Sequence, residues 1–414
     1  MKENTILEQH RSPAHWKVQC FRWVIENRKV NTNENLPLLG ANIHLGVTER
    51  FDGDGRAPAS EDLSKYKKVE PGDIIMNPLG KPHGSIGRSE TTGITSPAYW
   101  VLRVNEIENS SRYFHYLLRS EFMIEEFKRR SKNLPPNQFD LPWEDFREIS
   151  ICLPPIAEQS KIAEYLDIQV KVINQAIESK NRVLELSEAA YMAQLRQLLT
   201  PPKDLENFKS QGWATKKVAW MFKTGSGTTP TSDKPEYFEG SIPWVNSGDL
   251  NDSIVTDSKS KISNVALEDF SALRLYPKKS LLVAMYGATV GKTGILGISA
   301  CVNQAVCVLE SIAELSTSYA HYWFLANRQS LIEQSVGGGQ PNINQEIIRQ
   351  QRISFPSSDT QAKIMNEIQK ISKHRTARSE IVMRSIESLA KYKDSLITSA
   401  VTGSIKVISG KKSA

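Results

Sequence analysis

The sequence has few of the side chains that bind metals or form disulfide frameworks. Its 414 residues include four cysteines and seven histidines, and no two cysteines form a Cys-x-x-Cys pair. Structural zinc sites and disulfide-rich secreted domains both need such closely spaced residues. We therefore expect no metal site, and free thiols in a reducing compartment. The cysteines are Cys20, Cys152, Cys301 and Cys307.

Long apolar segments are also lacking. No run of about 18 apolar residues occurs, although a membrane-spanning helix needs that length. The residues after Met1-Lys2-Glu3 do not have the pattern of a signal peptide. These two absences predict a cytoplasmic protein without a membrane partner.

Motifs of methyl transfer and hydrolysis are missing as well. There is no Gly-rich strand–helix turn for a methyl donor, and no Asn/Asp-Pro-Pro-aromatic motif. The segments Asn77-Pro78-Leu79 and Asn133-Leu134-Pro135-Pro136 lack the aromatic residue that would stack on a base. No Ser-His-Asp set, carboxylate pair or metal-ligand spacing stands out. We expect no catalysis within this chain.

One segment has a partial likeness to a nucleotide-binding loop. Gly287 and Gly291-Lys292-Thr293 are separated by three residues, whereas a P-loop has four residues between its glycines. The following residues, 294–298, predict a turn and a strand, whereas a P-loop opens a helix. The sequence therefore favours a Gly-rich hairpin tip that allows close approach of a DNA strand. A structural turn is the alternative.

The bulk composition is that of a globular protein with a basic bias. Hydrophobic residues make up 39% and charged residues 24% of the chain, with a net charge of +6 and a pI near 8.9. The length suffices for two or three domains with their own cores. The charge suits an anionic partner without identifying one.

The chain contains an internal duplication. Residues near 15–200 recur near 213–400 in the same order, with an offset that drifts between 207 and 202. This period is far longer than that of a solenoid repeat, so it indicates a duplicated domain. Two related but diverged modules suggest a reader of two different half-sites. The matching segments are Leu36-Pro37-Leu38 with Ile242-Pro243-Trp244, Gly80 and Gly84 with Gly287 and Gly291, Tyr113, His115 and Tyr116 with Tyr319, His321 and Tyr322, and Pro154…Gln159 with Pro356…Gln361.

Each half predicts a mixed α/β (α+β) module followed by a long helix. Short apolar runs bounded by Gly, Pro, Asn and Ser predict buried strands. Residues 113–130 and 318–335 predict helices that pack on these strands. The strand-like runs are 72–76, 99–104, 280–285 and 305–309.

The long helices carry a narrow apolar seam. In the second helix the seam residues step by four and three, which is a coiled-coil heptad pattern weakened by Arg375 and Arg378. The first helix has a similar spacing. A narrow seam needs a partner helix, so we predict that the two helices pair antiparallel about a pseudo-twofold axis. The alternative is that each helix packs only on its own domain. The seams are Ile364, Ile368, Ile371, Arg375, Arg378, Val382, Ser385, Leu389, Tyr392 and Leu396, and Leu166, Val170, Ile173, Ile177, Leu184, Tyr191, Leu195 and Leu198.

Three segments carry a resemblance to a known family. The start of the first long helix, Glu158–Ala163, and the closing segment Ser395–Val407 resemble those of type I restriction–modification specificity subunits. The loop Thr224–Pro230, with the later Ile242–Val245, resembles the opening of a target recognition domain. The first half lacks this Gly-Thr-Thr-Pro loop and has Val24–Lys29 there. The resemblance covers nearly the whole chain in the expected order.

This resemblance implies an architecture and a function. It implies target recognition domains at 1–155 and 203–357, a spacer helix at 156–202, and a second spacer helix with the C-terminal segment at 358–414. Each recognition domain would read one half of a bipartite, asymmetric sequence in double-stranded DNA. The helices would set the gap and dock two methyltransferase subunits, and restriction/translocase subunits would join for cleavage. The subunit itself would be non-catalytic, with S-adenosylmethionine, ATP and Mg in the partner subunits.

Side chains that can read bases occur in loops of both halves. Arg and Lys bond to guanine, and Asn and Gln bond to adenine, in the major groove. Any one of them is as compatible with a phosphate contact or a solvated surface group. The candidates are Lys81, His83 and Arg88 in the first half, with Asn42 as a weaker one, and Lys223, Thr228, Asn246, Tyr286, Lys292, Asn303 and Gln304 in the second.

Two other functions remain open at the level of sequence. The first is a scaffold that joins two protein partners through the helices and has only non-specific affinity for DNA. The second is a nucleotide hydrolase that uses the Gly-Lys-Thr segment. A split motif enriched from random DNA would separate the specificity subunit from the scaffold.

Overall fold

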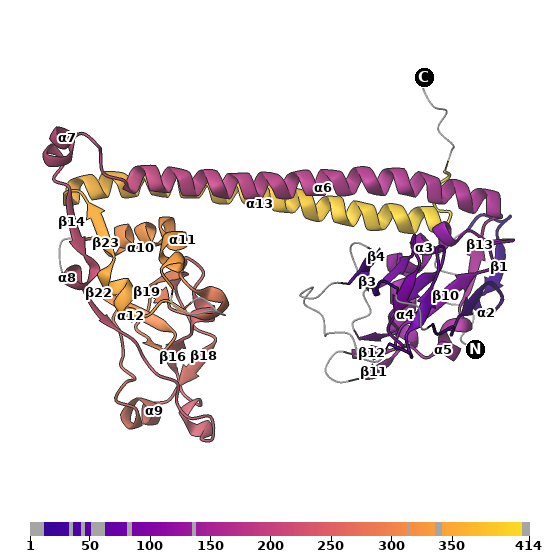
Figure 1. The fold of residues 1–414 in the computed structure, drawn as a ribbon, viewed down its shortest axis with the longest axis horizontal. Coiled ribbons are helices and arrows are strands. Elements are labelled where there is room, and N and C mark those ends of the chain that lie inside the picture. Colours follow the sequence, from indigo (N-terminus) through magenta and orange to yellow (C-terminus); the bar gives the residue numbers. More distant parts are fainter. Residues whose placement is uncertain are drawn as a thin grey trace. The chain divides into compact units, whose positions relative to one another are not determined.

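The protein is divided into two compact units (Figure 1). Unit 1 comprises Met1–Asn181 and Met383–Ala414, and unit 2 comprises Arg182–Val382. The structure is a computed structural model. It describes residues 12–32, 36–42, 46–50, 63–80, 85–134, 138–312, 315–335 and 342–407. Within these ranges no helix has the length and apolar character that crossing a membrane requires.

Unit 1 is built on a four-stranded antiparallel sheet in the order β2-β10-β6-β8. Strand β1 pairs antiparallel with β13, which leads into the long helix α6. Helix α3 packs on the sheet, since Phe114 and Leu117 share a core with Ile74 and Leu102. The strands are β1 (Lys17–Cys20), β2 (Ile25–Asn27), β3 (Leu39–Asn42), β4 (Gly46–Glu49), β5 (Lys67–Val69), β6 (Ile74–Met76), β7 (Leu79–Gly80), β8 (Ile86–Arg88), β9 (Gly93–Thr95), β10 (Trp100–Val104), β11 (Lys132–Leu134), β12 (Gln138–Asp140) and β13 (Ser150–Leu153). The short helices are α2 (Phe21–Val24), α3 (Ser111–Arg119), α4 (Glu121–Arg130) and α5 (Trp143–Arg147).

Unit 2 repeats this plan with a five-stranded sheet in the order β15-β22-β19-β20-β17. Strand β14 pairs antiparallel with β23, which leads into the second long helix. The strands are β14 (Ala214–Lys217), β15 (Phe222–Gly225), β16 (Ile242–Val245), β17 (Ser253–Val255), β18 (Ser260–Ile262), β19 (Leu281–Ala284), β20 (Thr293–Leu296), β21 (Cys301–Val302), β22 (Val306–Ser311) and β23 (Arg352–Phe355). The helices are α7 (Leu205–Ser210), α8 (Val218–Met221), η1 (Pro235–Tyr237), η2 (Ser247–Asp249), α9 (Asn264–Asp269), η3 (Gly287–Thr289), α10 (Thr317–Ala326), α11 (Arg328–Glu333) and α12 (Gln345–Gln350).

The apolar runs predicted as strands are strands β6, β10, β19 and β22, so the mixed α/β assignment is confirmed. Each helix predicted after them is divided in two. Ser120 ends α3 and caps α4, because its hydroxyl accepts a hydrogen bond from the Met123 amide at 3.3 Å. Asn327 separates α10 from α11, and its side chain donates to the Trp323 carbonyl at 2.9 Å. Ser and Asn favour such breaks because their side chains compete for backbone groups.

The long helices α6 (Ile156–Leu199) and α13 (Ser358–Val401) lie side by side in each unit (Figure 1). In unit 2 the Tyr191 hydroxyl lies 2.8 Å from that of Ser372, and Arg375 donates to Glu188 at 2.6 Å. Tyr191 comes after Glu188 in α6, whereas its partner Ser372 comes before Arg375 in α13. The two helices therefore run antiparallel, as predicted. In unit 1 the same pairing brings Lys393 to Asn174 at 3.2 Å.

The seam of α13 departs from the predicted heptad after Arg375. Arg378 and Tyr392 are exposed, whereas Ser379 and Lys393 are half-buried. The seam therefore takes two successive steps of four at Arg375, which is a stutter that locally unwinds a coiled coil. Arg375 lies over the Tyr191 ring at 4.6 Å, so the slip coincides with a polar and aromatic contact.

The first turn of each long helix is fixed to its domain by a buried glutamine. Gln159 accepts a hydrogen bond from the Ser110 amide at 2.9 Å and donates to the Pro154 carbonyl at 2.9 Å. Gln361 repeats both contacts, to Ser316 at 3.1 Å and Pro356 at 2.9 Å. The Pro…Gln motif thus attaches the helix to the start of α3 or α10.

Candidate nucleic-acid interface

In unit 2, two loops meet because two strands run parallel. Strand β16 pairs with β21 in parallel, with Trp244 opposite Cys301 and Val245 opposite Val302. The carboxyl ends of parallel strands lie at the same edge. The turn after β16 and the turn after β21 are therefore adjacent, and the Asn303 amide donates to the Val245 carbonyl at 3.1 Å.

The turn Asn303–Ala305 is the centre of this region. The Asn303 side chain accepts a hydrogen bond from the Ala305 amide at 3.1 Å, which fixes the turn. The Ala305 carbonyl accepts one from the Met285 amide at 2.8 Å. This second bond brings the tip between β19 and β20, with Tyr286, beside the turn.

The Gly-rich loop 224–230 packs against the same turn. The Thr229 hydroxyl donates to the Gln304 side chain at 2.6 Å, and the Trp244 indole donates to the Thr228 carbonyl at 3.2 Å. A side chain at Gly227 would overlap the Val302 carbonyl oxygen. Close packing of the loop on β21 therefore requires glycine at this position, whether or not the loop contacts a ligand.

Six of the seven candidates of unit 2 are brought together at this edge. We call them, with Thr229, the loop cluster: Thr228, Thr229, Asn246, Tyr286, Lys292, Asn303 and Gln304. Gln304 is exposed, whereas Tyr286 and Lys292 are half-buried. Lys223 is not part of the cluster, because it lies opposite Glu310, toward the other end of β22.

The loop cluster faces open space on two sides. Added Cβ atoms at Gly248, in η2, and at Gly287, in η3, would meet nothing within 4 Å. Gly287 has φ 81°, so its turn itself needs a left-handed residue. After η3 the chain continues into strand β20 and not into a helix, which excludes a phosphate-binding P-loop at Lys292.

Two members of the cluster also have structural roles. The Asn246 amide bonds to Asp249 at 3.0 Å, and its side chain donates to the Trp244 carbonyl at 3.3 Å. Asn303 holds its own turn through Ala305. Gln304 and Thr229 are the exposed members of the cluster, and they are hydrogen-bonded to each other, so their side chains are accessible to a ligand.

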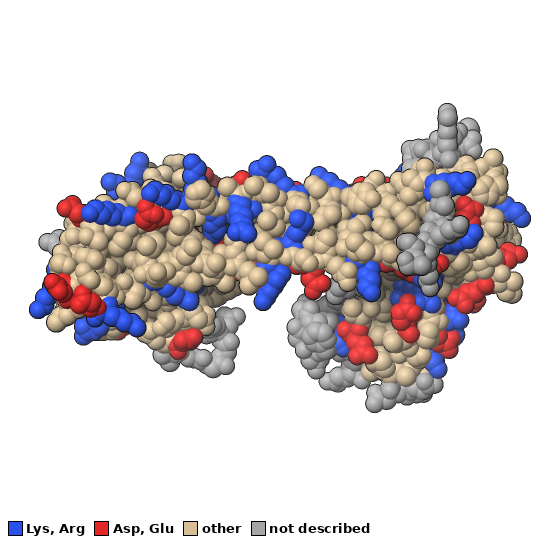
Figure 2. Space-filling model, turned by 90° about the horizontal axis from the view of Figure 1, so that it is seen from above, with Lys and Arg blue, Asp and Glu red and all other residues tan. Residues whose placement is uncertain are grey.

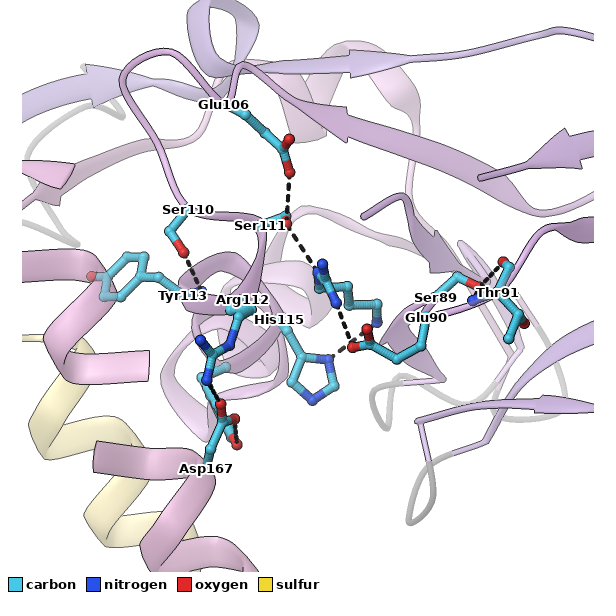
Figure 3. A network of polar contacts seen from close by, with 12 residues as sticks. Ser89, Glu90, Thr91, Glu106, Ser110, Ser111, Arg112, Tyr113, His115 and Asp167 are labelled. Atoms are coloured by element: carbon cyan, nitrogen blue, oxygen red, sulfur yellow. Dashed lines mark hydrogen bonds and ion pairs between the residues drawn. The ribbon is translucent and has the colours of Figure 1, made fainter. Parts of the chain in front are cut away.

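In unit 1, two of the three candidates, Lys81 and His83, lie outside the described residues. The third, Arg88, belongs to a polar network on α3, of which Figure 3 shows Glu90, Glu106, Ser111 and His115. Its guanidinium donates to the Ser111 hydroxyl at 2.9 Å and forms an ion pair with Glu90. The Arg88 side chain is 18% exposed, so internal contacts account for most of its surface.

The histidines of the repeated motif are neutral, with His321 buried and His115 half-buried. Burial lowers the pKa of His115 to about 3, and the same cause lowers that of His321 to about 4. The Arg88 amide donates to the unprotonated Nδ1 of His115 at 3.2 Å. The neighbouring Tyr113 donates to the Val401 carbonyl at 2.8 Å. The motif thus joins α3 to the sheet and to α13.

Unit 1 contains an equivalent of the Asn303 turn that sequence comparison missed. Leu38 forms a parallel bridge with Ile94, just as Trp244 pairs in parallel with Cys301 in unit 2. When the two pairings are superposed, Ser96-Pro97-Ala98 corresponds to Asn303-Gln304-Ala305. The Ala98 amide donates to the Ser96 hydroxyl at 3.4 Å, and the Tyr99 amide to the Ser96 carbonyl at 3.0 Å. The match of Pro37 with Pro243 was a signal for this pairing, but the residues of the turn differ.

The weaker candidate Asn42 ends strand β3 in the same region. Its carbonyl accepts a hydrogen bond from Arg119 of α3 at 3.4 Å. The Arg119 guanidinium also donates to the Ile86 carbonyl of β8. Arg119 thus joins the end of β3 to the main sheet of unit 1.

Basic residues are not concentrated at the loop cluster, which contains one lysine. Lys and Arg side chains are spread along the described part of the face seen in Figure 2, with Asp and Glu among them. The cluster is instead rich in amide and hydroxyl groups. Its chemistry suits hydrogen bonds to base edges more than neutralisation of phosphates.

Comparisons with known proteins place the chain among DNA specificity proteins. A family model described as "Type I restriction modification DNA specificity domain" matches residues 65–186 and again 210–382. The chain is 23% identical over 301 residues to the EcoR124I/EcoR124II specificity subunit of Escherichia coli, covering 69% of this chain and 70% of that protein. It is 26% identical over 157 residues to the MjaIX specificity subunit of Methanocaldococcus jannaschii, and this match spans 37% of this chain and only 36% of that protein.

A solved structure shares the fold. It comes from a study of "complex assembly and conformational transition of the type I R-M system", with a TM-score of 0.71 and 17% identity. The match covers 96% of this chain and 100% of that one. At this identity the likeness concerns the fold alone.

Proposed function

Because the chain belongs to the family of type I restriction–modification DNA specificity domains, we propose that each unit reads one half of a bipartite, asymmetric DNA sequence. The family's subunits are non-catalytic, so this chain is a recognition subunit and not an enzyme. We assign the recognition domains to residues 1–155 and 203–357. The spacer helices, at 156–202 and in 358–414, set the gap between the half-sites.

One observation carries this proposal. The two units build equivalent turns beside a parallel pairing, which is the strand pair β16–β21 in unit 2 and the single bridge Leu38–Ile94 in unit 1. The turn residues are Asn303-Gln304 in one unit and Ser96-Pro97 in the other. Equivalent turns with different side chains are what two readers of different sequences require. Asn and Gln can each form two hydrogen bonds with adenine, whereas Ser bonds less selectively and Pro has no donor.

The candidate residues then take different roles. Gln304 and Asn303 contact base edges, Lys292 contacts a guanine or a phosphate, and Thr228 and Tyr286 border them. In unit 1 we propose Lys81 and His83 as the contacting residues. Arg88 acts by positioning, because its guanidinium is held by Ser111 and Glu90.

We further propose that the outer faces of the long helices dock two methyltransferase subunits, with restriction/translocase subunits joining for cleavage. Large apolar residues are exposed on these faces in both units, which supports the docking of partner proteins. They include Ile168, Val172 and Tyr392 in unit 1, and Leu186 and Ile381 in unit 2. In this assembly S-adenosylmethionine, ATP and Mg belong to the partners.

The test is selection from random duplex DNA by the complex of this chain with its methyltransferase subunits. We expect a split motif with a fixed gap. Gln304→Ala should lower the preference at one half-site by about 5- to 150-fold, since a bidentate base contact is worth about 1–3 kcal/mol. Lys223→Ala, an exposed residue of the same unit outside the loop cluster, is the matched control.

Two outcomes would contradict the proposal. Enrichment of no motif, with binding that falls uniformly as salt rises, would favour a scaffold with non-specific affinity for DNA. A change in both half-sites on Gln304→Ala would mean that the units are not independent readers.

A further inference from the structure

Each unit exposes one tryptophan, and the two occupy equivalent positions. All eight tryptophans lie in the described part of the chain, and only Trp23, 75% exposed, and Trp220, 62% exposed, have most of their surface in contact with solvent. Each is the third residue of a one-turn helix, α2 or α8, that follows the first strand of its unit. Each helix leads directly into an edge strand of the main sheet, β2 or β15.

The two helices are held by the same backbone contacts. The first amide of α2, from Phe21, donates to the Ile149 carbonyl at 2.9 Å, and the first amide of α8, from Val218, donates to the Gln351 carbonyl at 2.9 Å. Ile149 and Gln351 each lie immediately before the last strand, β13 or β23. The two tryptophans are therefore presented by the same local structure.

A surface ion pair is also repeated in the helix that packs against each tryptophan-bearing helix. Helix α2 packs against α5, in which Arg147 pairs with Glu144 at 3.3 Å. Helix α8 packs against α12, in which Arg349 pairs with Glu346 at 3.4 Å. We call the exposed tryptophan with its Glu–Arg pair the tryptophan patch of each unit.

The fold does not account for the repetition of the tryptophan. Segments Phe21–Val24 and Val218–Met221 differ at every position except this one. Their buried positions have exchanged Phe for Val and Val for Met, whereas the exposed indole is the same in both. A side chain with most of its surface in water contributes little to the stability of its own unit. Binding to another molecule therefore explains why both positions hold tryptophan.

We propose that the tryptophan patches are two equivalent docking sites, each of which takes one copy of the same partner protein. This rests on the proposed function, in which the partner present in two copies is the methyltransferase subunit. Tryptophan is enriched among residues that dominate protein–protein binding, where it fills a desolvated pocket. Two identical patches suit two identical partners, whereas the loop clusters differ as two half-sites differ.

The charge around each tryptophan defines the partner surface further. Segments Lys17–Val24 and Ala214–Met221 each contain two basic residues and no acidic residue, namely Lys17 and Arg22, and Lys216 and Lys217. Arg22 already forms an ion pair with Glu148 of its own unit, so Lys17, Lys216 and Lys217 are the cations offered to a partner. The complementary surface is an apolar pocket for an indole, bordered by carboxylates. Duplex DNA fits less well, because its bases are stacked and its phosphates offer the indole ring no apolar contact.

The experiment uses the full chain with its methyltransferase subunit, and native mass spectrometry counts bound copies over a partner titration. Trp23→Ala and Trp220→Ala should each weaken one of the two copies by at least about 30-fold, the effect of losing a hot-spot residue. The double variant should weaken both. Leu79→Ala and Ile254→Ala are controls, 44% and 63% exposed on other strands, and both should keep two copies.

Three outcomes would overturn the docking proposal. The first is two copies bound with unchanged affinity by the double variant. The second is equal loss in the control variants. The third is unchanged partner binding with weaker binding to an unrelated duplex, which would make the patch a nucleic-acid contact.

Folding and the proposed function are checked separately. Thermal unfolding of each variant should match that of the original chain, because the replaced side chains are exposed. Trp23→Phe and Trp220→Phe should restore most of the lost partner affinity. A wild-type complex that selects no split motif would refute the recognition function, whereas a wild-type complex that selects one while the tryptophan variants bind normally would refute only the docking sites.

Discussion

Replacing Gln159 by leucine should loosen unit 1 at one place and leave unit 2 unchanged. The side chain is 1% exposed and makes three hydrogen bonds, to the Ser110 amide, the Pro154 carbonyl and the Asn109 side chain, at 2.9, 2.9 and 3.1 Å. Leucine has a similar volume but leaves all three groups without this partner. Each buried group that loses its partner costs about 1–3 kcal/mol.

The expected net loss is about 3 kcal/mol, because the apolar side chain recovers part of the cost. A loss of that size corresponds to roughly 100-fold faster hydrogen exchange of the amides that open with this contact. Exchange measured by mass spectrometry on the assembled complex should therefore accelerate at the start of α3 and in the first turn of α6. Because α6 is attached here, selectivity for one half-site should also fall.

The duplication supplies the controls. Gln361→Leu should produce the same acceleration around Ser316 in unit 2 and spare unit 1. Gln175→Leu replaces an exposed glutamine of the same helix and should change nothing. Equal effects of Gln159→Leu and Gln175→Leu, or acceleration spread over both units, would refute the anchoring role.

Three further predictions address the loops, His115 and the helices. Gly227→Ala should displace the Gly-rich loop from Val302 and reduce selectivity at one half-site, whereas Gly248→Ala, where an added Cβ meets nothing within 4 Å, should not; equal selection profiles would contradict this. The folded-state pKa of His115 is lowered from 6.5 to about 3, so the neutral imidazole contributes stability at pH values above its unfolded pKa. This contribution to the free energy of unfolding is lost as the pH falls toward 3. Urea unfolding of the original chain should show about 2 kcal/mol more loss between about pH 7 and pH 5 than that of His115→Asn, which keeps an acceptor but does not titrate, and equal losses would argue against it. Seven residues inserted in each long helix keep heptad register and add roughly 10 Å, so the preferred gap should grow by about three base pairs; a complex that still selects the original gap would refute the spacer role.

Local patterns predicted the elements of this fold, but not the contacts between distant segments. The apolar runs and the heptad seam identified strands and long helices, since both signals are local. The Pro…Gln repeat was visible in the sequence, but the role of Gln159 depends on Ser110, which lies far away in the chain. The equivalence of Ser96 with Asn303 was hidden because only the parallel strand pairing reveals it.

Arg88 illustrates why single charged residues are hard to assign from sequence. An arginine near a Gly-rich hairpin has the composition of a base reader, yet its guanidinium is held by Ser111 and Glu90. These partners come from the start of α3 and from the residues after β8, so no spacing rule connects all of them. The exposed tryptophans were missed for the opposite reason, because burial cannot be read from an isolated aromatic residue.

The ion pair that is repeated in the two tryptophan patches is a second feature shared by both units. The loops that we propose to read the two half-sites differ between the units instead. Exposed ion pairs contribute little to stability, commonly about 0–1 kcal/mol. The energy of the ion pairs therefore does not explain why Glu144–Arg147 and Glu346–Arg349 both survive in helices whose other residues differ. Arg349 also donates to the Thr224 hydroxyl at 3.0 Å, so it has a structural contact of its own in unit 2. Gln159 and Gln361 are also identical, but both are buried and the fold requires them. An ion pair that is exposed and repeated and contributes little energy to its own unit supports the proposed docking surface, and its repetition fits one partner surface that contacts both units.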